Sequence, residues 1–573
     1  MIGPLVRKAR QLLEDPVLRM WLYRRALRLE PPEPGFVAGQ PPYLRIDRSF
    51  ADRAAWQDGT AEIRFEEPSS PTKISLAGAV VCVRPETPEA FFRRTNDDLE
   101  TMLSAHRFAW VPVAGEAVDG RWVAALWTAW MDGFSDRAEG WPWHPYTAAE
   151  RAINIIDFAR RRGLPGDAGR TVAVLARHAE AIASSLEYFG DHYTSNHLAN
   201  NGRGLLRIGT ALGLGEAVRM GTDILVAEGD RIFGPAGMLR EGSSHYHLLL
   251  ARNYLDAWLE SDRAALAAAP HLREIAGRAL RAAQRLRMSG GVPTIGDISP
   301  DCPPDFLAAL ADPDDGGATG WVGQLDPEQR SALDALRAEV AATDAESIGK
   351  DGWNRFGTDG WEAMTFVPRD GWVPMPGHGH QDLGAFELHC GSIRVVVDPG
   401  RGSYAVSPAD RFYQAATAHS GLTIDGVDPA PVNRPYYSDA FRVRIVPEPP
   451  AFSGSPADAT LTHGGYRRLR GVGRVSRRWR ISEGRVSVAD RIDGSGARRI
   501  ARRIVTPYRV AMENGSAVID AGTARFRVAF GSPISLEPIT CWTAYGMGFP
   551  GTVIASEQHT RLPFEATINI ERL

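Results

Sequence analysis

Three short stretches of the sequence concentrate histidines beside amide, phenol and carboxyl side chains. The third stretch, GHGHQDLGAFELHCGSIRVVVDPGRGSY, begins with His378 and His380, and Asp382 follows. On a strand the two imidazoles would share a face, and Asp382 could orient one of them. Asp398 closes the next apolar run, and His419 comes later. Two histidines and an aspartate are suitable ligands for zinc, whereas hydrogen-bonded polar residues at a sheet edge are the alternative.

The first stretch, TSNHLANNGRG, places Asn196, His197 and Asn200 at the start of an expected helix. A capping role for Ser195 or Asn196, beside a hydrogen-bonded histidine, explains these residue types without any chemistry. An asparagine next to a histidine is a weak functional signal when taken alone. Capping is therefore the favoured interpretation of this stretch.

The second stretch, REGSSHYHLLL, contains Glu241, His245, Tyr246 and His247 at another expected helix start. These side chains could serve packing only. A phenol held near an imidazole can also give or take a proton. Proton transfer is therefore the functional alternative to packing here.

A tryptophan-rich segment, RWVAALWTAWMDGFSDRAEGWPWHPY, comes before these stretches. Aromatic residues at helical spacing are usually core residues, which is the favoured interpretation. Trp141, Trp143, His144 and Tyr146 instead fall in the loop-like WPWHPY, where rings could stack on sugars. The segment therefore predicts either a packed core or the wall of a carbohydrate cleft.

The candidate residues lie on two different kinds of expected structure. From about Glu89 to Ala342 the apolar residues recur at helical spacing between short breaks, typical of helical hairpins stacked around a common axis. From about Gly349 onward, runs such as AFELHCGSIRVVVDPG, FRVRIVPEPP and ATINIERL read as strands separated by Gly, Pro and Asp. These runs indicate a large antiparallel β-sandwich. We expect a mixed extension over 1–88, a helical domain over 89–348 and a sandwich over 349–573.

The composition is that of an ordinary globular protein. The 573 residues are 44% hydrophobic and 23% charged, and the net charge of −4 does not indicate a nucleic-acid-binding protein. An arginine-rich run, RRLRGVGRVSRRWR, is interpreted as the solvated faces of two strands, with a polyanion-binding face as the alternative. The four cysteines are far apart, so neither a disulfide framework nor a thiolate zinc site is expected.

The N-terminal segment shows neither a signal peptide nor a membrane span, because charges interrupt it every few residues. It resembles one or two basic amphipathic helices, for which core or interface packing is favoured over contact with a membrane surface. The missing signal favours a cytoplasmic location, with the periplasm or secretion as alternatives. The sequence is compatible with a homodimer.

Taken together, three ordered blocks resemble the heparinase II/III-like polysaccharide lyases, which include alginate lyases of similar build. The blocks are SNHLANNGRGLL, EGSSHYHLLLARNYLDA, and the stretch from GHGHQDLG continuing to RFYQAATAHSGLTIDG. WHPYTAAERAINIIDF and HGGYRRL fit the same family, so the resemblance covers most of the chain from about Trp143 to Arg480. It implies an N-terminal (α/α) toroid, an incomplete barrel of helical hairpins, followed by an antiparallel β-sandwich. The catalytic cleft would lie between the two domains.

The resemblance also implies roles for individual residues. The catalytic set would be Asn196, His197, Tyr246 and His378. The residues expected to bind substrate are Trp143, His144, Tyr146, Asn200 and Glu241. The ligands of a structural zinc, with no organic cofactor, would be His380, Asp398 and His419.

The implied reaction is β-elimination in a uronic-acid-containing polysaccharide or oligosaccharide. The C5 proton is poorly acidic beside a charged carboxylate, so Asn196 and His197 would neutralise that carboxylate. Tyr246 would act as the acid, and also as the base in syn elimination. His378 would be the base for the opposite uronate epimer.

Two departures from the family pattern keep other functions open. Asn200 stands where some relatives carry a carboxylate, and no signal peptide is visible. The main alternative is a non-catalytic glycan-binding or assembly protein that serves exopolysaccharide or capsule production. A third hypothesis is a hydrolase with paired carboxylates, for which Glu241 and Asp382 are the candidates.

Overall fold

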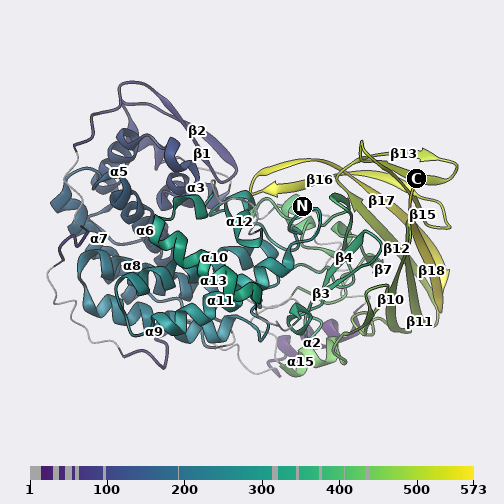
Figure 1. The fold of residues 1–573 in the computed structure, drawn as a ribbon. Coiled ribbons are helices and arrows are strands. Elements are labelled where there is room, and N and C mark those ends of the chain that lie inside the picture. Colours follow the sequence, from purple (N-terminus) through teal and green to yellow (C-terminus); the bar gives the residue numbers. More distant parts are fainter. Residues whose placement is uncertain are drawn as a thin grey trace.

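In the computed structural model of the chain, helices fill one half of the molecule and β-sheets fill the other (Figure 1). The predicted fold class, a helical toroid followed by an antiparallel β-sandwich, is confirmed. Among the described residues, no helix combines the length and the apolar character needed to cross a membrane. The structure describes residues 15–29, 38–45, 54–58, 64–94, 98–191, 193–312, 320–342, 347–372, 377–405, 407–432 and 439–573.

The expected N-terminal extension contributes to both halves of the molecule. Helix α2 (Pro16–Ala26) begins at Asp15, whose carboxylate accepts the N–H groups of residues 17 and 18 and pairs with Arg468 of the sheet half at 2.7 Å. Strands β1 (Thr72–Leu76) and β2 (Ala79–Val83) form a hairpin that packs against the helices. The extension is therefore not a separate body.

Antiparallel neighbours joined by short connections make up the helical half, which we call the toroid. Helix α8 packs against α6, α7 and α9. At the α8–α9 contact a Cβ on Gly221 would lie 2.5 Å from the backbone nitrogen of Leu206, so glycine permits this close approach. The helices are α3 (Leu99–Arg107), α4 (Trp110–Ala114), α5 (Gly120–Phe134), α6 (Pro145–Arg162), α7 (Ala168–Ser184), α8 (Asn196–Leu212), α9 (Gly215–Ile232), α10 (Ser244–Arg263), α11 (Ala269–Leu286), α12 (Ala308–Ala311) and α13 (Pro327–Ala342).

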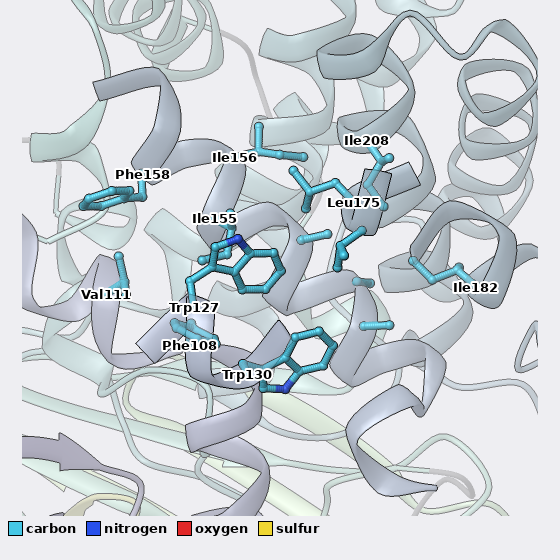
Figure 2. Close-up of a cluster of buried hydrophobic side chains, with 14 of the residues drawn as sticks. Phe108, Val111, Trp127, Trp130, Ile155, Ile156, Phe158, Leu175, Ile182 and Ile208 are labelled. Atoms are coloured by element: carbon cyan, nitrogen blue, oxygen red, sulfur yellow. The ribbon is translucent and has the colours of Figure 1, made fainter. Parts of the chain in front are cut away.

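The tryptophan-rich segment supplies much of the toroid core, as its helical spacing favoured (Figure 2). Trp127 and Trp130 of α5 are fully buried and their rings stack with centroids 5.4 Å apart. Ile155, Ile156 and other apolar residues of α6 pack around them. This core holds α6 and α8 in fixed positions, and the functional stretches lie at the ends of these and neighbouring helices.

The sheet half, which we call the sandwich, is antiparallel in every strand pair of the described residues. Its strand orders are β13-β14-β15-β18-β11-β10-β9-β8, β16-β17-β12-β7 and β3-β4-β5-β6. Alternate side chains of β10, such as that of Trp479, enter a core shared by the sheets. Arg478 and Arg480 are exposed, as expected for a solvated strand face, but Arg468 and Arg477 of the same arginine-rich run are buried, and the run reaches one strand and not two.

The strands are β3 (Trp353–Phe356), β4 (Trp361–Phe366), β5 (Glu387–Cys390), β6 (Ile393–Val396), β7 (Leu422–Ile424), β8 (Ala451–Ser455), β9 (Asp458–His463), β10 (Val472–Ser482), β11 (Arg485–Gly494), β12 (Ala497–Thr506), β13 (Arg509–Glu513), β14 (Ser516–Asp520), β15 (Arg525–Ala529), β16 (Ser535–Ala544), β17 (Met547–Arg561) and β18 (Phe564–Arg572). The last helix of the toroid ends at Ala342 and the first of these strands begins at Trp353. The predicted boundary between residues 348 and 349 falls between these two elements and stays a prediction.

One local prediction for this half is wrong. The run FRVRIV was expected to be a strand, but its first five residues lie in helix α15 (Asp439–Ile445), where Phe441 and Ile445, four residues apart, are buried with Trp21. Tertiary contacts there outweigh a local alternation of apolar residues. The stretch that begins with His378 and His380 was expected to be a strand hairpin; β5 and β6 form it, and the two histidines lie in the loop that precedes it.

The segment that follows α11 crosses from the toroid to the sandwich. Ser289 donates a hydrogen bond to the carbonyl of Gly391 at 2.6 Å, and the N–H of Thr294 donates to Glu387 at 2.8 Å. Further along, the N–H of Asp297 donates to the carbonyl of His378 at 2.8 Å. These bonds join the two domains where the functional stretches meet.

Candidate functional site

Two helix starts of the toroid face the histidine loop of the sandwich. Ser195 caps α8 by accepting the N–H of His197, and Ser243 caps α10 by accepting the N–H of Tyr246. Asn196 and Tyr246 therefore lie in the first turns of their helices. The capping interpretation of the first stretch is correct for Ser195, and it leaves the side chain of Asn196 available for another role.

The carboxylate of Glu241 links these helix starts to the loop. Its Oε1 accepts the N–H of Asn196 at 2.8 Å, and its Oε2 lies 3.5 Å from Nε2 of His378. The ring of Tyr246 stacks on the ring of His378, with centroids 3.4 Å apart and planes at 8°. The structure thus brings Asn196, Tyr246 and His378 together. Glu241 is only 1% exposed, so it organises this group from within and does not fit the expected role in direct substrate binding.

Asp297, a residue that the sequence interpretation missed, orients the imidazole of His378. Its carboxylate lies 3.2 Å from Nδ1 of His378, 2.9 Å from Nε2 of His380 and 3.2 Å from a guanidinium nitrogen of Arg401. Burial alone would raise the pKa of Asp297, but these donors hold it well below its ordinary value. An ionised carboxylate only accepts hydrogen bonds, so Nδ1 of His378 carries a proton, while Nε2 points to the side of Glu241.

A second missed residue, Tyr404, contacts the phenol of Tyr246. The two hydroxyl groups are 2.9 Å apart, and the Tyr404 hydroxyl donates to the carbonyl of Ile298 at 3.1 Å. Tyr246 is therefore the donor within the pair. Burial raises the pKa of both phenols well above the ordinary value, so both are neutral near pH 7. Tyr404 is the last residue of the GHGHQDLG stretch, and only its place in the fold identifies it as a neighbour of Tyr246.

The side-chain amide of Asn196 lacks a hydrogen-bond partner on both its nitrogen and its oxygen, among the contacts of the described residues. The residue is only 2% exposed. Buried polar groups in native proteins are nearly always paired, so an unpaired amide on a residue that shares Glu241 with His378 indicates a position that a ligand completes. Asn200, one helical turn further on, donates to the carbonyl of Tyr146 at 3.4 Å, and its side-chain oxygen is also unpaired.

His197 is paired with a carboxylate that the sequence interpretation also missed, that of Glu187. Nδ1 of His197 lies 2.7 Å from the Glu187 carboxylate, and Nε2 of His144 lies 3.5 Å from the same oxygen. Burial lowers the pKa of His197, but the charge and hydrogen bond of Glu187 outweigh it, so the pKa is raised overall. The side chain is still 41% exposed, so this imidazole reaches the solvent next to Asn196.

The aromatic residues expected to stack on substrate divide into two groups. Trp143 is 4% exposed, and its indole N–H donates to the carbonyl of Phe134, so the expectation for Trp143 is corrected: it is a core residue. Tyr146 is also buried, and its hydroxyl donates to Asp301 at 2.5 Å. Trp141 is 50% exposed, and its ring lies 5.5 Å from that of His144. Trp141 and His144 are therefore the rings that a glycan can reach.

Three residues that were expected to bind metal form a buried cluster. Donor atoms of His380, Asp398 and His419 all lie within 4.8 Å of one another. Nδ1 of His380 and Nε2 of His419 are buried without a hydrogen-bond partner, while Nδ1 of His419 is 2.7 Å from the carboxylate of Asp398. Two unpaired imidazole nitrogens and a carboxylate suit zinc. Asp382, expected to orient an imidazole, has an unpaired buried oxygen, and burial raises its pKa to about 6.

The comparisons with known proteins agree with this architecture. Residues 341–563 match the sequence profile of the family described as Heparinase II/III-like, C-terminal. The solved structure of heparinase III is 14% identical with a TM-score of 0.61, covering 84% of this chain and 79% of that chain. The heparinase III product BT4657 is 14% identical with a TM-score of 0.55, covering 85% and 80%. None of the curated proteins compared with the sequence matches it.

A mutant of the heparan sulfate lyase HepC from Pedobacter heparinus is 13% identical, with a TM-score of 0.53, and the match covers 84% of this chain and 77% of that chain. At such identities the shared property is the fold. The resemblance seen in the sequence motifs is confirmed: residues 341–563 match the heparinase II/III-like C-terminal profile, and the chain shares the toroid-and-sandwich fold with heparinase III.

Proposed function

We propose that the protein is a polysaccharide lyase that cleaves a uronic-acid-containing glycan by β-elimination at the junction of the toroid and the sandwich. One observation carries this proposal: Glu241 links Asn196, whose buried side-chain amide is unpaired, to His378, whose ring stacks on that of Tyr246. A carboxylate-binding amide next to two proton-transfer groups is the set of side chains that β-elimination requires. Proteins named as heparinase III and heparan sulfate lyase share the fold.

The first task in this reaction is to neutralise the substrate carboxylate. Loss of the C5 proton places negative charge on that carboxylate, and preorganised donors stabilise it. Asn196 offers amide hydrogens with no competing partner, and His197, whose pKa Glu187 raises, offers a positive charge. Together they would lower the free energy of the enolate-like intermediate.

The second task is to move two protons. A base removes the C5 proton, the C4–O4 bond breaks, a C4–C5 double bond forms, and an acid protonates O4. Tyr246 is a neutral phenol and is suited to be the acid. In syn elimination the phenol would first lose its proton to the solvent, and the phenolate, stabilised by the Tyr404 hydroxyl turned from Ile298, would take the C5 proton and then give it to O4. For the opposite epimer, Nε2 of His378 would be the base.

We propose a structural zinc held by His380, Asp398 and His419. Bound there, the ion would fix the histidine loop to the segments that carry Asp398 and His419. The ligand cluster is distinct from Nε2 of His378, and the proton transfers described above are carried out by the protein side chains.

The second candidate function is glycan binding without cleavage. Tyr246 is 6% exposed and Asn196 is 2% exposed, so the proton-transfer groups are shielded in this structure. Trp141, His144 and His197 are accessible and could hold a glycan at the surface. This candidate predicts saturable glycan binding with no shortening of the chain.

A screen for unsaturated uronate tests the proposal. The protein is incubated with heparin, heparan sulfate, hyaluronan, alginate, polyglucuronate and a bacterial exopolysaccharide mixture, and the ultraviolet absorbance of the new double bond is followed. Growth on one polymer that Tyr246→Phe and His378→Ala abolish supports both the reaction and the residues. Full activity in both variants contradicts the assigned roles. Binding to a polymer that is never shortened favours the second candidate.

A further inference from the structure

We propose that Asp297 is a positioning residue that fixes the orientation of two imidazole rings: that of His378 for proton transfer and that of His380 for metal binding. The part that concerns His378 rests on the proposed lyase function. The part that concerns His380 does not, because it can be measured on the resting protein.

Asp297 belongs to the segment that follows α11 of the toroid, whereas all three donors to its carboxylate belong to the sandwich. His378 and His380 reach it from the histidine loop at 3.2 and 2.9 Å, and Arg401 reaches it at 3.2 Å from the segment after β6. The residue is only 4% exposed. One buried carboxylate from the segment after α11 therefore accepts hydrogen bonds from three donors of the sandwich. Hydrogen bonds to an ionised group are stronger than those between neutral groups.

Backbone contacts fix the position of this carboxylate. The N–H of Asp297 donates to the carbonyl of His378 at 2.8 Å, and the carbonyl of Asp297 accepts from the hydroxyl of Ser243 at 2.7 Å. Gly296 has a φ of +82°, and a Cβ there would lie 2.6 Å from the carbonyl oxygen of Gly242 and 2.8 Å from that of His378. Only glycine fits at that position, so three loops are held together directly beside Asp297.

The two imidazoles use opposite nitrogens toward Asp297, which explains how one carboxylate can serve both. His380 donates through Nε2, so its unpaired Nδ1 faces the cluster with Asp398 and His419. His378 donates through Nδ1, so its Nε2 lies on the side of Glu241 and Asn196. A histidine ligand commonly donates its second ring N–H to a carboxylate, which sets the tautomer and the ring orientation. Asp297 accepts the second ring N–H of His380 in this way, and it also accepts a ring N–H of His378.

The Asp297→Asn variant is nearly isosteric and can accept from one imidazole but no longer from both. The matched control is Asp351→Asn, a junction carboxylate that accepts the backbone N–H groups of Ala236 and Met238 and contacts neither imidazole. Both variants are first compared with the wild type by thermal unfolding, to establish that each is folded.

The first test is zinc affinity, measured on the full chain by competition with a chromogenic chelator. Asp297→Asn should weaken zinc binding about 10–100-fold, the usual effect of losing a carboxylate behind a histidine ligand. Asp351→Asn should leave it unchanged. Wild-type affinity in Asp297→Asn, or a wild type that takes up no zinc, overturns the part of the proposal that concerns His380.

The second test separates the two imidazoles kinetically, on a polymer that the wild type cleaves. Asp297→Asn should lower kcat by about 10²-fold with little change in KM, because a displaced base reacts slowly although the substrate still binds. His380→Ala removes the metal ligand and its bond to Asp297 but leaves the bond between Asp297 and His378, so Asp297→Asn should lower kcat further in that background. Equal rates for His380→Ala and the double variant overturn the part that concerns His378.

The third test needs no substrate, so it distinguishes failure of this proposal from failure of the lyase function. Nitrogen-15 NMR of labelled histidine rings should show that Nδ1 of His378 carries a proton in the wild type. The signal of this protonated Nδ1 should be lost in Asp297→Asn. If the wild type cleaves no polymer but its ring signals change in this way, the positioning role stands and the lyase proposal fails. Unchanged ring signals overturn the positioning role.

Discussion

Tyr246 and His378 stack ring on ring across the junction of two domains, with centroids 3.4 Å apart and planes at 8°. Tyr246 is fixed by the first turn of α10, and His378 is fixed by backbone bonds from its N–H to Glu241 and from Asp297 to its carbonyl. Neither domain alone contains both groups. The candidate site therefore exists only when the toroid and the sandwich are docked.

Replacing the Tyr246 hydroxyl should abolish turnover and leave the fold intact. In Tyr246→Phe the ring still stacks on His378, and only the contact with Tyr404 is lost. We expect kcat to fall by about 10²–10⁴-fold, the range for loss of a general acid or base. Tyr43→Phe, which removes a hydroxyl bonded to Glu228, is the control and should retain activity. Wild-type rates in Tyr246→Phe would exclude the assigned role.

Glu187→Gln should shift the alkaline limit of activity to lower pH. Burial lowers the pKa of His197 and Glu187 raises it above the ordinary value, so removing the charge lets His197 lose its proton earlier. Because the folded pKa lies above the unfolded value of about 6.5, this pair stabilises the fold fully below that pH, and the stabilisation is lost as pH rises through the folded pKa. The pH profile of kcat/KM and urea unfolding at several pH values measure both effects. An unmoved alkaline limb would contradict the pairing.

Two tryptophans two residues apart should behave oppositely when truncated. Trp143→Ala removes a core ring and should cost about 3–5 kcal/mol of unfolding free energy. Trp141→Ala removes a half-exposed ring beside His144, so stability should hardly change while KM for the glycan rises. Denaturant unfolding and steady-state kinetics on both variants check this. A stability loss confined to Trp141→Ala would reverse the assignment.

Removal of metal should lower the thermal stability of the wild type. Zinc that binds the folded cluster but not the unfolded chain stabilises by mass action, about 2.7 kcal/mol at a free concentration of 100 times Kd. We expect a chelator to lower Tm in the wild type and to have no effect on His419→Ala, whose cluster lacks one donor. An identical Tm for the wild type with and without chelator, together with no zinc in the purified protein, would contradict the proposed site.

The sequence predicts the architecture well because apolar periodicity reports directly on burial. Helical spacing in α6 and α8 and alternation in β10 identified the two domain types. The run FRVRIV failed because Phe441 and Ile445 are also spaced for one face of a helix, and the cluster with Trp21 decided between the two. In a short run of this kind, the apolar residues fit both the helical spacing and the strand spacing.

The candidate site was predicted only in part, and the omissions have a common cause. Asn196, Tyr246 and His378 stand in distinctive motifs and could be named in advance. Asp297 and Glu187 stand in ordinary surroundings, and their importance arises from contacts with residues 81 and 10 positions away. The partners of Asp297 are set by the docking of the two domains and those of Glu187 by packing within the toroid, so neither carboxylate leaves a local sequence pattern.

The origin of the oxygen in the cleavage products tests the central claim most directly. The polymer that gives the strongest signal in the uronate screen is cleaved in water enriched in oxygen-18, and the masses of the products are measured by mass spectrometry. β-Elimination forms a double bond without adding water, so the account predicts unsaturated products with no heavy oxygen, formed by the wild type and not by Tyr246→Phe. Saturated products that carry one heavy oxygen at the cleaved bond would show hydrolysis and contradict it.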